Sequence, residues 1–532
     1  EMLTRDWSSD VCSSDLGSDI RGVSTEGYPG EIPNLTVKEA TRIAMGFLLW
    51  LMNKTGKEAS GIKVSIGRDP RITGMELKYG LLNGMGPYDV KILDCGLAST
   101  PAMFMSTIFP EFDCDGAIMI TASHLPFNRN GFKFFSKDGG LDKEDITQIL
   151  ETASSDRALM KLKAQPVKKK PALDRMTKYT GRPVPLMETY CKHIRNMIKR
   201  EVNHPVAYYH PLTGMKIVID AGNGSGGFYA DKILAPLGAD TRGSRFLKPN
   251  GRFPNHAPNP EDEQAIKSIC EAVIEKKADL GLIFDTDVDR SAAVDSSGKE
   301  IARNGIVAMA AALVADKHPG TTVVTDSITS TQLTDFLEKE LGLKHLRFKR
   351  GYKNVINKAI ELNEAGIDSQ LAIETSGHAA FKENFFLDDG AYLAAKVVIK
   401  AAVLFLEGRK IDSVLARLQS PAEAVEMRIP IEVEDFAAAG DRIIEALAKW
   451  TRRQDGMHVV TPNYEGVRIA FNETGAAGVK GWCLLRKSLH DPLLPLNIES
   501  EVKGGCKKIA DILLDALKEF DELDLEALLQ QE

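Results

Sequence analysis

Short apolar runs that end in loops of small and charged residues recur along the chain. Residues 118–120 are apolar and lead into a polar stretch at 121–124, and a second apolar run follows at 132–135. This pattern predicts a strand, an exposed loop and a second strand, and the Asn-Gly pair at 130–131 predicts a turn. A serine on such a loop, here Ser123, can act as a nucleophile, although an ordinary turn serine fits this stretch taken alone.

The same layout returns further along the chain. An apolar run at 280–284 ends in the acidic stretch 285–290, and another at 370–373 ends in the polar stretch 374–378. We interpret the chain as three successive α/β units, each with a chemically rich loop after a strand. Sites on α/β sheets lie at the carboxyl ends of strands, so we expect these loops to face one cleft.

The pattern of predicted elements changes after about residue 420, where shorter strands (427–433, 467–471 and 482–486) alternate with helices at 436–452 and 502–525. The expected fold class is therefore α/β, with three similar mixed-sheet domains and a smaller C-terminal α+β domain. The expected domains are 17–214, 215–318, 319–420 and 421–532. Within the first, residues 151–214 predict an extended crossing with one helix at 186–200. Residues 1–16 repeat a polar pattern without an apolar core and are interpreted as a non-native leader.

Composition narrows the function classes. The 532 residues are 43% hydrophobic and 27% charged, with a net charge of −7, which argues against general nucleic-acid binding. The seven cysteines are scattered and favour reduced thiols and a cytoplasmic location. No apolar run is long enough to predict a membrane span.

Three carboxylates, Asp285, Asp287 and Asp289, stand at alternate positions directly after an apolar strand. Continued extension would point them the same way, and three like charges together favour a hard cation such as Mg²⁺. Carboxylates that face water or cap a helix are the alternative. The D-x-D start also matches the strand end of haloacid-dehalogenase-type phosphatases, in which the first aspartate is the nucleophile.

A serine beside a divalent metal favours phosphoryl transfer. His124 and Lys133 lie near Ser123 in sequence and are candidates for a base or a charge stabiliser. Other loops offer binding groups: Arg21 beside a glycine for phosphate, Glu374 and Ser376 for sugar hydroxyls, His378 for proton transfer, and Arg486 with Ser488 for a distal phosphate.

Several ordered motifs together resemble those of the α-D-phosphohexomutase family, which includes phosphoglucomutases and phosphomannomutases. Residues 121–126 (TASHLP) are similar to its T-A-S-H-N-P serine motif, and residues 285–290 (DTDVDR) to its D-G-D-G-D-R metal loop. Residues 373–378 (IETSGH) correspond to its G-E-x-S-G-H sugar loop. Secondary matches are 67–71, 100–101, 253–260 and 388–390.

The resemblance implies a heart-shaped, four-domain enzyme around a central cleft, closed by a movable last domain. It would interconvert a hexose 1-phosphate and a hexose 6-phosphate, of glucose and/or mannose, through a phosphorylated Ser123 and a bound 1,6-bisphosphate. Glucose 1,6-bisphosphate, or the matching hexose bisphosphate, would activate it, and the protein would be a monomer or homodimer. The implied roles are as follows: metal ligands Ser123, Asp285, Asp287 and Asp289; catalytic residues Ser123, His124, Lys133, Arg21 and His378; substrate-binding residues Arg290, Gly351, Lys353, Glu374, Ser376, Arg486 and Ser488.

The last motif departs from the family. Its R-x-S-G-T-E-P-x-x-R phosphate loop aligns without gaps to 486–495, where Leu489-His490 replaces Gly-Thr and Pro495 replaces the second arginine. This change predicts weaker distal phosphate binding or a shifted substrate. Two other functions stay open on sequence alone: a phosphatase that uses Asp285, and a non-catalytic sugar-phosphate sensor.

Overall fold

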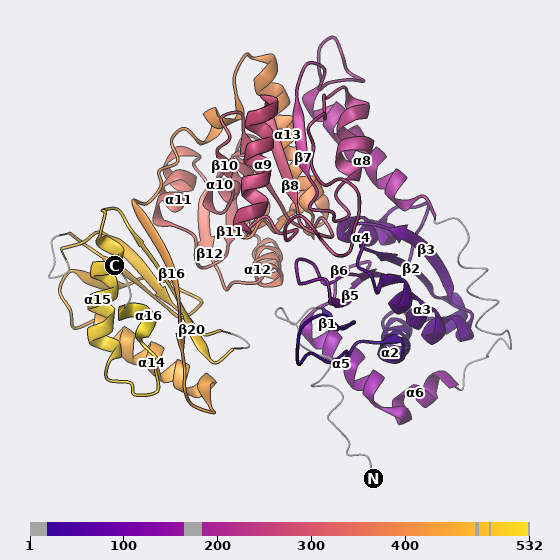
Figure 1. Ribbon diagram of the computed structural model, residues 1–532, viewed down its shortest axis with the longest axis horizontal. Coiled ribbons are helices and arrows are strands. Elements are labelled where there is room, and N and C mark those ends of the chain that lie inside the picture. The colour runs from indigo at the N-terminus through magenta and orange to yellow at the C-terminus, as the bar shows by residue number, and fades with distance from the viewer. Residues whose placement is uncertain (1–18, 164–183, 474–477, 489–490, 530–532) are drawn as a thin grey trace. The chain divides into compact units, whose positions relative to one another are not determined.

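The computed structural model describes residues 19–163, 184–473, 478–488 and 491–529 (Figure 1). The chain forms two compact units, the first from 1–313 and 376–416 and the second from 314–375 and 417–532. The predicted leader at 1–16 lies outside the described residues, as do Leu489 and His490. The predicted boundaries of the four domains stay a prediction.

The first sheet of unit 1 has the order β1-β5-β4-β2-β3, with β6 on the free side of β5. Parallel and antiparallel pairs both occur in it. Helices cover both of its faces, because Phe134 packs against Phe47 of α2 while its neighbour Phe135 packs against Phe104 of α4. The bounds are β1 Ile20–Val23, β2 Lys63–Arg68, β3 Lys91–Leu97, β4 Gly116–Ile120, β5 Arg129–Ser136, β6 Gly139–Gly140, α2 Val37–Thr55, α3 Gly74–Met85, α4 Thr100–Ile108 and α5 Lys143–Ser154.

The turn predicted at the Asn-Gly pair is wrong, because both residues lie inside β5. Gly131 pairs with Arg21 of β1. A Cβ atom at Gly131 would lie 2.2 Å from the carbonyl oxygen of Ile20 and 2.8 Å from that of Thr121. The glycine therefore allows a close approach of two backbones rather than a turn, and residues 121–128 make the connection between β4 and β5.

The second sheet of unit 1 has the order β10-β9-β8-β7, with β7 and β8 parallel and the other pairs antiparallel. Helices α9 and α13 both pack against β8. The hairpin of β14 and β15 precedes α13 and belongs to the same unit. The bounds are β7 Ile217–Asp220, β8 Leu280–Phe284, β9 Ser291–Asp295, β10 Glu300–Ile301, β14 Ala379–Phe381, β15 Leu387–Asp388, α9 Glu263–Lys276, α10 Asn304–Ala315 and α13 Gly390–Leu406.

The segment between the two sheets contains more helix than its sequence predicted. The expected helix is α8, Leu186–Val202, and its amphipathic face packs against α13 and α4. A second helix, α6, spans Asp156–Lys163, and α5 runs on to Ser154. The prediction of a single helix was therefore wrong, since short amphipathic helices can form where Lys and Met are frequent.

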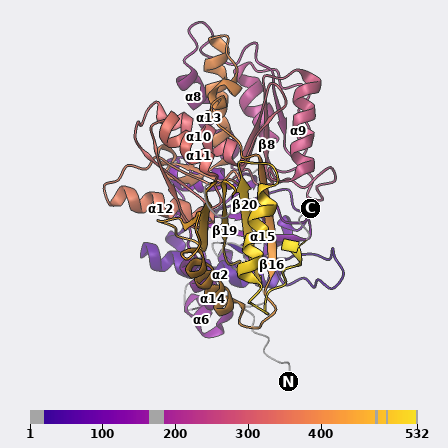
Figure 2. The same cartoon turned by 90° about the vertical axis from the view of Figure 1, so that its left-hand side faces the viewer.

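Unit 2 contains the parallel strands β12-β11-β13 and a separate antiparallel sheet, β16-β20-β19-β18-β17. Helices α14 and α15 lie over the antiparallel sheet and share one apolar core with it (Figure 2). The bounds are β11 Thr322–Thr325, β12 Lys344–Arg347, β13 Leu371–Ile373, β16 Glu423–Pro430, β17 Met457–Val459, β18 Val467–Phe471, β19 Gly481–Leu485, β20 Leu493–Ser500, α11 Thr331–Asp335, α12 Tyr352–Glu364, α14 Phe436–Thr451, α15 Gly505–Leu517 and α16 Glu526–Leu529.

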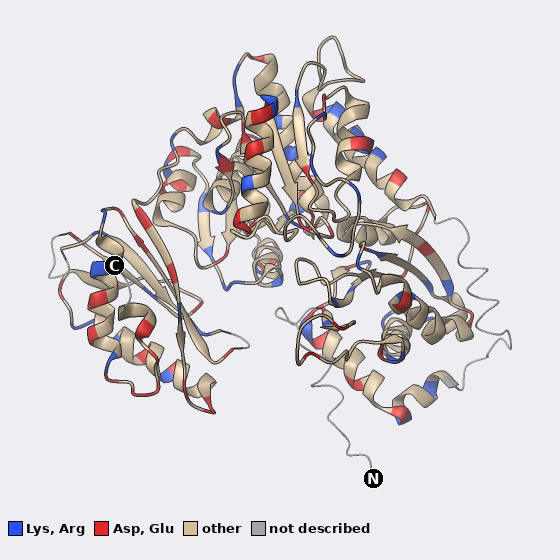
Figure 3. Cartoon of the chain, viewed as in Figure 1, with Lys and Arg blue, Asp and Glu red and all other residues tan. Residues whose placement is uncertain are grey.

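The expected fold class is confirmed: β1 to β15 combine parallel and antiparallel pairs in three α/β regions, and an antiparallel α+β domain follows. The predicted helix at 502–525 is shorter than expected, since α15 ends at Leu517. Among the helices described, none has the length and apolar surface that crossing a bilayer requires. Basic and acidic residues are intermingled on helices such as α9 and α15 (Figure 3).

Candidate active site

The loop after β4 presents Ser123 with an unusual backbone. Ser123 has φ +51°, in the left-handed region, and its N–H donates to Thr121 Oγ1 at 2.9 Å. Its side-chain Oγ donates to Asp285 Oδ2 at 3.1 Å and lies 3.4 Å from His124 Nδ1. Residues 162 positions apart in the chain are thus brought into contact within unit 1. A non-glycine residue in this region of backbone space often marks a functional site.

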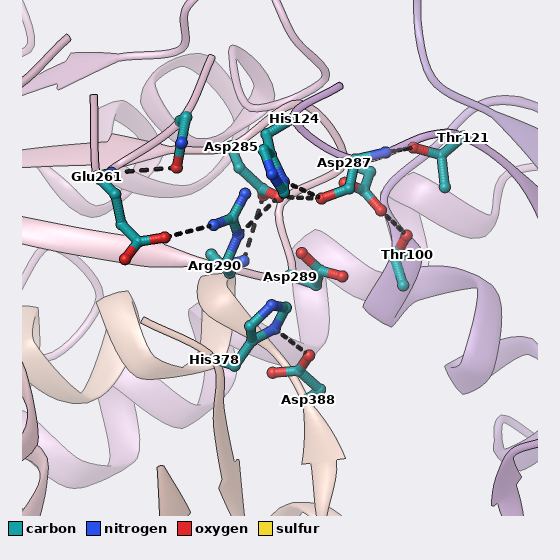
Figure 4. Close-up of polar contacts among 12 residues, drawn as sticks. Thr100, Thr121, His124, Glu261, Asp285, Asp287, Asp289, Arg290, His378 and Asp388 are labelled. Carbon is teal, nitrogen blue, oxygen red and sulfur yellow. Dashed lines mark hydrogen bonds and ion pairs between the residues drawn. The ribbon is translucent and has the colours of Figure 1, made fainter. Parts of the chain in front are cut away.

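The three carboxylates of the acidic loop after β8 come together because the loop turns, not because the strand continues. Asp285, Asp287 and Asp289 each place a carboxylate oxygen within 4.8 Å of the others, and all three are buried (Figure 4). Residues 286–289 form a turn and bend, and Val288 has φ +68°. The expectation of an extended strand was therefore wrong. A valine stands in a left-handed position that favours glycine, which strains this loop.

Two basic side chains face the three carboxylates. Lys133 Nζ donates to Asp287 Oδ2 at 3.0 Å and also to Asp289 Oδ2. Arg290, only 1% exposed, places Nε 3.3 Å from Asp285 Oδ2. Since all these groups are removed from water, their charges interact strongly.

The pKa values of the outer two aspartates move apart. Burial, and then the charges of Asp289 and Asp287, raise the pKa of Asp285 well above its usual range. Burial also opposes ionisation of Asp289, but Lys133 and His378 hold its pKa below the usual range. Carboxylates that share a small volume behave in this way because they cannot all ionise without a counter-charge.

The donor set fits a hard cation. Asp287 Oδ1 and Asp289 Oδ1 are buried and have no hydrogen-bond partner among the described residues. Buried carboxylate oxygens without a donor are costly, and a divalent cation would satisfy them. The arrangement therefore fits a metal held by oxygen ligands.

A histidine–aspartate pair adjoins the acidic loop. His378 Nδ1 lies 2.5 Å from Asp388 Oδ2. These two residues and Asp289 form a second group whose possible metal-ligand atoms all lie within 4.8 Å of one another. Burial would lower the pKa of His378, but Asp388 and then Asp289 raise it to about 9. His378 is thus protonated at neutral pH and can donate a proton.

His124 has the opposite character. Burial, and then the charges of Arg290 and Arg21, lower its pKa well below the usual range. Its imidazole is therefore neutral at physiological pH. Arg21 is buried in β1 and is oriented by Asp19, whose Oδ2 accepts from Arg21 Nη2 at 2.7 Å.

The contacts of two residues at the site, Thr100 and Glu261, were missed from the sequence. Thr100 donates to Asp287 Oδ2 through its hydroxyl and to the Asp287 carbonyl oxygen through its N–H, the latter at 2.8 Å. Glu261 Oε2 lies 3.5 Å from Arg290 Nη1. The Thr100-Pro101 motif signalled the first residue but not its partner, and Glu261 in a proline-rich loop carried no signal.

The remaining predicted residues divide between the units. Ser376 lies in unit 1, and its buried Oγ has no partner among the described residues. In unit 2, Glu374 Oε1 accepts from the N–H of Gly351 at 2.6 Å, and Gly351 has φ +112° where α12 begins. Lys353 is the second residue of that helix. The sugar-loop motif thus crosses from unit 2 to unit 1 between Thr375 and Ser376.

Arg486 and Ser488 also lie in unit 2, directly after β19. Arg486 Nε is buried and has no hydrogen-bond partner within the part of the chain that the structure describes, and Ser488 Oγ accepts from the Asp491 N–H at 3.2 Å. Pro495, which aligns without gaps to the second arginine of the phosphate-loop motif, lies inside β20 opposite Arg428, and its carbonyl accepts from the Arg486 N–H at 3.1 Å. The effect of the altered phosphate loop stays a prediction.

The fold and the site together define a multidomain α/β protein in which a serine hydroxyl faces a buried, metal-suited acidic loop. Sequence models described as phosphoglucomutase/phosphomannomutase alpha/beta/alpha domains I, II and III match residues 17–159, 188–298 and 303–420. The chain therefore belongs to the phosphoglucomutase/phosphomannomutase family, whose members are phosphohexomutases, a class of intramolecular phosphotransferase.

Individual relatives span nearly the whole chain. A phosphomannomutase/phosphoglucomutase of Pseudomonas syringae pv. tomato is 28% identical over 484 residues, covering 90% of this chain and 92% of its own. A phosphoglucomutase of Neisseria gonorrhoeae is 27% identical, with 90% and 94% covered. The crystal structure of a phosphoglucomutase/phosphomannomutase family protein from Burkholderia thailandensis has a TM-score of 0.71 at 24% identity, with 95% and 97% covered, and supports the fold.

Proposed function

We propose that this protein interconverts hexose 1-phosphate and hexose 6-phosphate, of glucose and/or mannose, through a phosphoserine at Ser123 and a bound 1,6-bisphosphate. The observation that carries the proposal is the 3.1 Å contact between Ser123 Oγ and Asp285 of the buried acidic loop. The names of the Pseudomonas and Neisseria relatives, phosphomannomutase/phosphoglucomutase and phosphoglucomutase, agree with it.

Asp285, Asp287 and Asp289 would hold Mg²⁺, and a phosphate on Ser123 would supply a further oxygen ligand. The cation would neutralise the charge of the phosphoryl group during transfer. Asp287 Oδ1 and Asp289 Oδ1, which have no hydrogen-bond partner among the residues described, support this assignment. Lys133, which contacts Asp287 and Asp289, would lie beside the same phosphoryl group as a fixed positive charge.

In the first half-reaction a sugar hydroxyl forms a bond to phosphorus while the bond from phosphorus to Ser123 Oγ breaks. The proton of that hydroxyl must end on Ser123 Oγ. His124 is placed to carry it, because its neutral Nδ1 lies 3.4 Å from that oxygen. The second half-reaction runs in reverse with the other phosphate of the bisphosphate. His378, protonated at neutral pH, supplies a second proton donor near Asp289.

The substrate contacts are proposed residue by residue, from the family motifs. Sugar binding is proposed for Ser376, Arg290, Glu374, Gly351 and Lys353. Arg486 and Ser488 would bind the distal phosphate with fewer ligands than the family motif provides. Glucose 1,6-bisphosphate, or the matching hexose bisphosphate, would restore the phosphoserine after loss of phosphate.

The test compares Ser123→Ala with the wild-type protein on the 1-phosphates of glucose, mannose and glucosamine side by side. We expect wild-type turnover and a complete loss in the variant, while Mn²⁺ binding, followed by electron paramagnetic resonance, persists. Ser136→Ala, on the strand that follows the same loop, is the matched control and should keep its activity. Full activity in Ser123→Ala would refute the proposal.

A further inference from the structure

A single buried guanidinium donates hydrogen bonds to backbone carbonyl groups in and directly after the loop at 121–128, which carries Ser123 and is called the serine loop below. Arg71, in the loop after β2, is 1% exposed. It donates to four carbonyl oxygens: those of Ser123 at 2.5 Å, Leu125 at 2.6 Å, Pro126 at 2.6 Å and Arg129 at 2.9 Å. Its Nε donates to Asp69 Oδ2 at 3.2 Å. All five donors of a guanidinium lie in one plane, so this set of acceptors fixes the shape of the loop.

Arg71, Asp69 and Thr121 together fix the carbonyl and the N–H of Ser123. The Ser123 carbonyl accepts from Arg71, and the Ser123 N–H donates to Thr121 Oγ1, which donates in turn to Asp69 Oδ2 at 2.8 Å. A left-handed backbone at a serine is strained and persists only where its surroundings enforce it. The Asp69–Arg71 pair therefore supplies the restraint that keeps Ser123 in this conformation.

Arg71 is itself held from a second direction. Its guanidinium lies over the ring of Phe253, with Cζ 5.2 Å from the ring centroid. A Cβ atom on the neighbouring Gly251 would lie 2.2 Å from the Pro70 carbonyl oxygen, so the two backbones are in close contact. The loop at 251–253 precedes α9, which packs on the second sheet, so Arg71 contacts both the serine loop and the part of unit 1 that carries the acidic loop.

We propose that Arg71 is a positioning residue for the nucleophile, which sets the direction of Ser123 Oγ toward the acidic loop. The inference rests on the proposed function, because the direction of Oγ matters only if Ser123 transfers the phosphoryl group. Arg71 contacts loop carbonyls rather than the reacting atoms. A displacement of about 1 Å at a reacting group can cost on the order of 10²-fold in rate.

The experiment uses Arg71→Lys in the full chain. Lysine keeps the positive charge but offers three donors on one nitrogen, so it cannot span the four carbonyls. Arg68→Lys is the matched control, since Arg68 is the last residue of β2, directly before the same loop, and donates to the Asp69 carbonyl at 3.0 Å. We expect kcat of Arg71→Lys to fall on the order of 10²-fold, with KM for the hexose 1-phosphate changed less than about twofold.

Two further readouts separate positioning from a general loss of structure. The rate at which glucose 1,6-bisphosphate phosphorylates Ser123 should fall by the same factor as kcat, while Mn²⁺ binding stays at the wild-type value. Thr121→Val, which removes the acceptor for the Ser123 N–H, should lower the phosphorylation rate about tenfold and serves if Arg71→Lys does not fold.

The inference is overturned if either variant keeps the wild-type phosphorylation rate, or if activity falls only in proportion to the folded fraction. A wild-type protein without mutase activity would instead refute the proposed function. The two failures are therefore distinguishable.

Discussion

Lys133 provides a direct test of the charge balance at the acidic loop. Its ion pairs to Asp287 and Asp289 are almost fully buried, with side-chain exposures of 6% and 0% for the first pair and 6% and 2% for the second. Lys133→Met keeps the length of the side chain and removes its charge. The positive charge of Lys133 is then lost, and Arg290 and His378 remain beside the carboxylates. Removing one partner of a buried ion pair typically costs about 3–5 kcal/mol, because the remaining charge stays buried.

This cost should depend on the metal. In EDTA we expect Lys133→Met to lower the melting temperature by about 6–10 °C, taking about 2 °C per kcal/mol for a large domain. A divalent cation replaces the missing positive charge, and a ligand that binds the folded state stabilises it. The rise in melting temperature on adding Mg²⁺ should therefore be larger in the variant than in the wild type.

Differential scanning fluorimetry in EDTA and over a Mg²⁺ series measures both effects. Lys137→Met is the matched control, since Lys137 directly follows β5, and its pair with Asp113 is exposed, with side-chain exposures of 50% and 64%. Solvent screens such a pair, so its melting temperature should stay close to the wild-type value in both conditions. Equal stability of Lys133→Met and wild type in EDTA, or an equal Mg²⁺ shift, would refute the reasoning.

Two other predictions concern packing. Gly131→Ala should destabilise unit 1 by about 1–3 kcal/mol, because its Cβ atom would lie 2.2 Å from a carbonyl oxygen. Urea unfolding measures this loss, with Gly61→Ala as the control, since the nearest contact of a Cβ atom there is at 3.8 Å. Equal unfolding midpoints for the two variants would contradict the clash. Arg468→Met should loosen unit 2, because Arg468 donates to the carbonyls of Ser327 and Thr329 at 2.9 and 3.1 Å. Hydrogen exchange of residues 326–330 should rise, and unchanged protection there would count against this role.

The strands that carry the chemistry were predictable because they are short, apolar and buried. Strand β8 has the predicted bounds, and the loop after β4 carries Ser123 as expected. The shape of the acidic loop was not predictable, since neither Thr286 nor Val288 signals a turn. Only the tertiary structure holds Val288 at a positive φ.

Local sequence is misleading at the Asn-Gly pair at 130–131, which predicts a turn but lies inside strand β5. Local propensity describes what an isolated segment prefers. Here Gly131 is needed where β1 and the serine loop approach closely. The partners of Arg71 were equally beyond local pattern, because they depend on how the serine loop folds around it.

The proposed reaction depends on Ser123 as the carrier of the phosphoryl group. Intact-mass measurement with peptide mapping, before and after incubation with glucose 1,6-bisphosphate and Mg²⁺, tests it most directly. We expect one phosphate on the peptide that contains Ser123, lost on incubation with a hexose phosphate and regained from the bisphosphate. A transient phosphate on Asp285, or retained sugar-phosphate binding with no covalent phosphate at all, would contradict it.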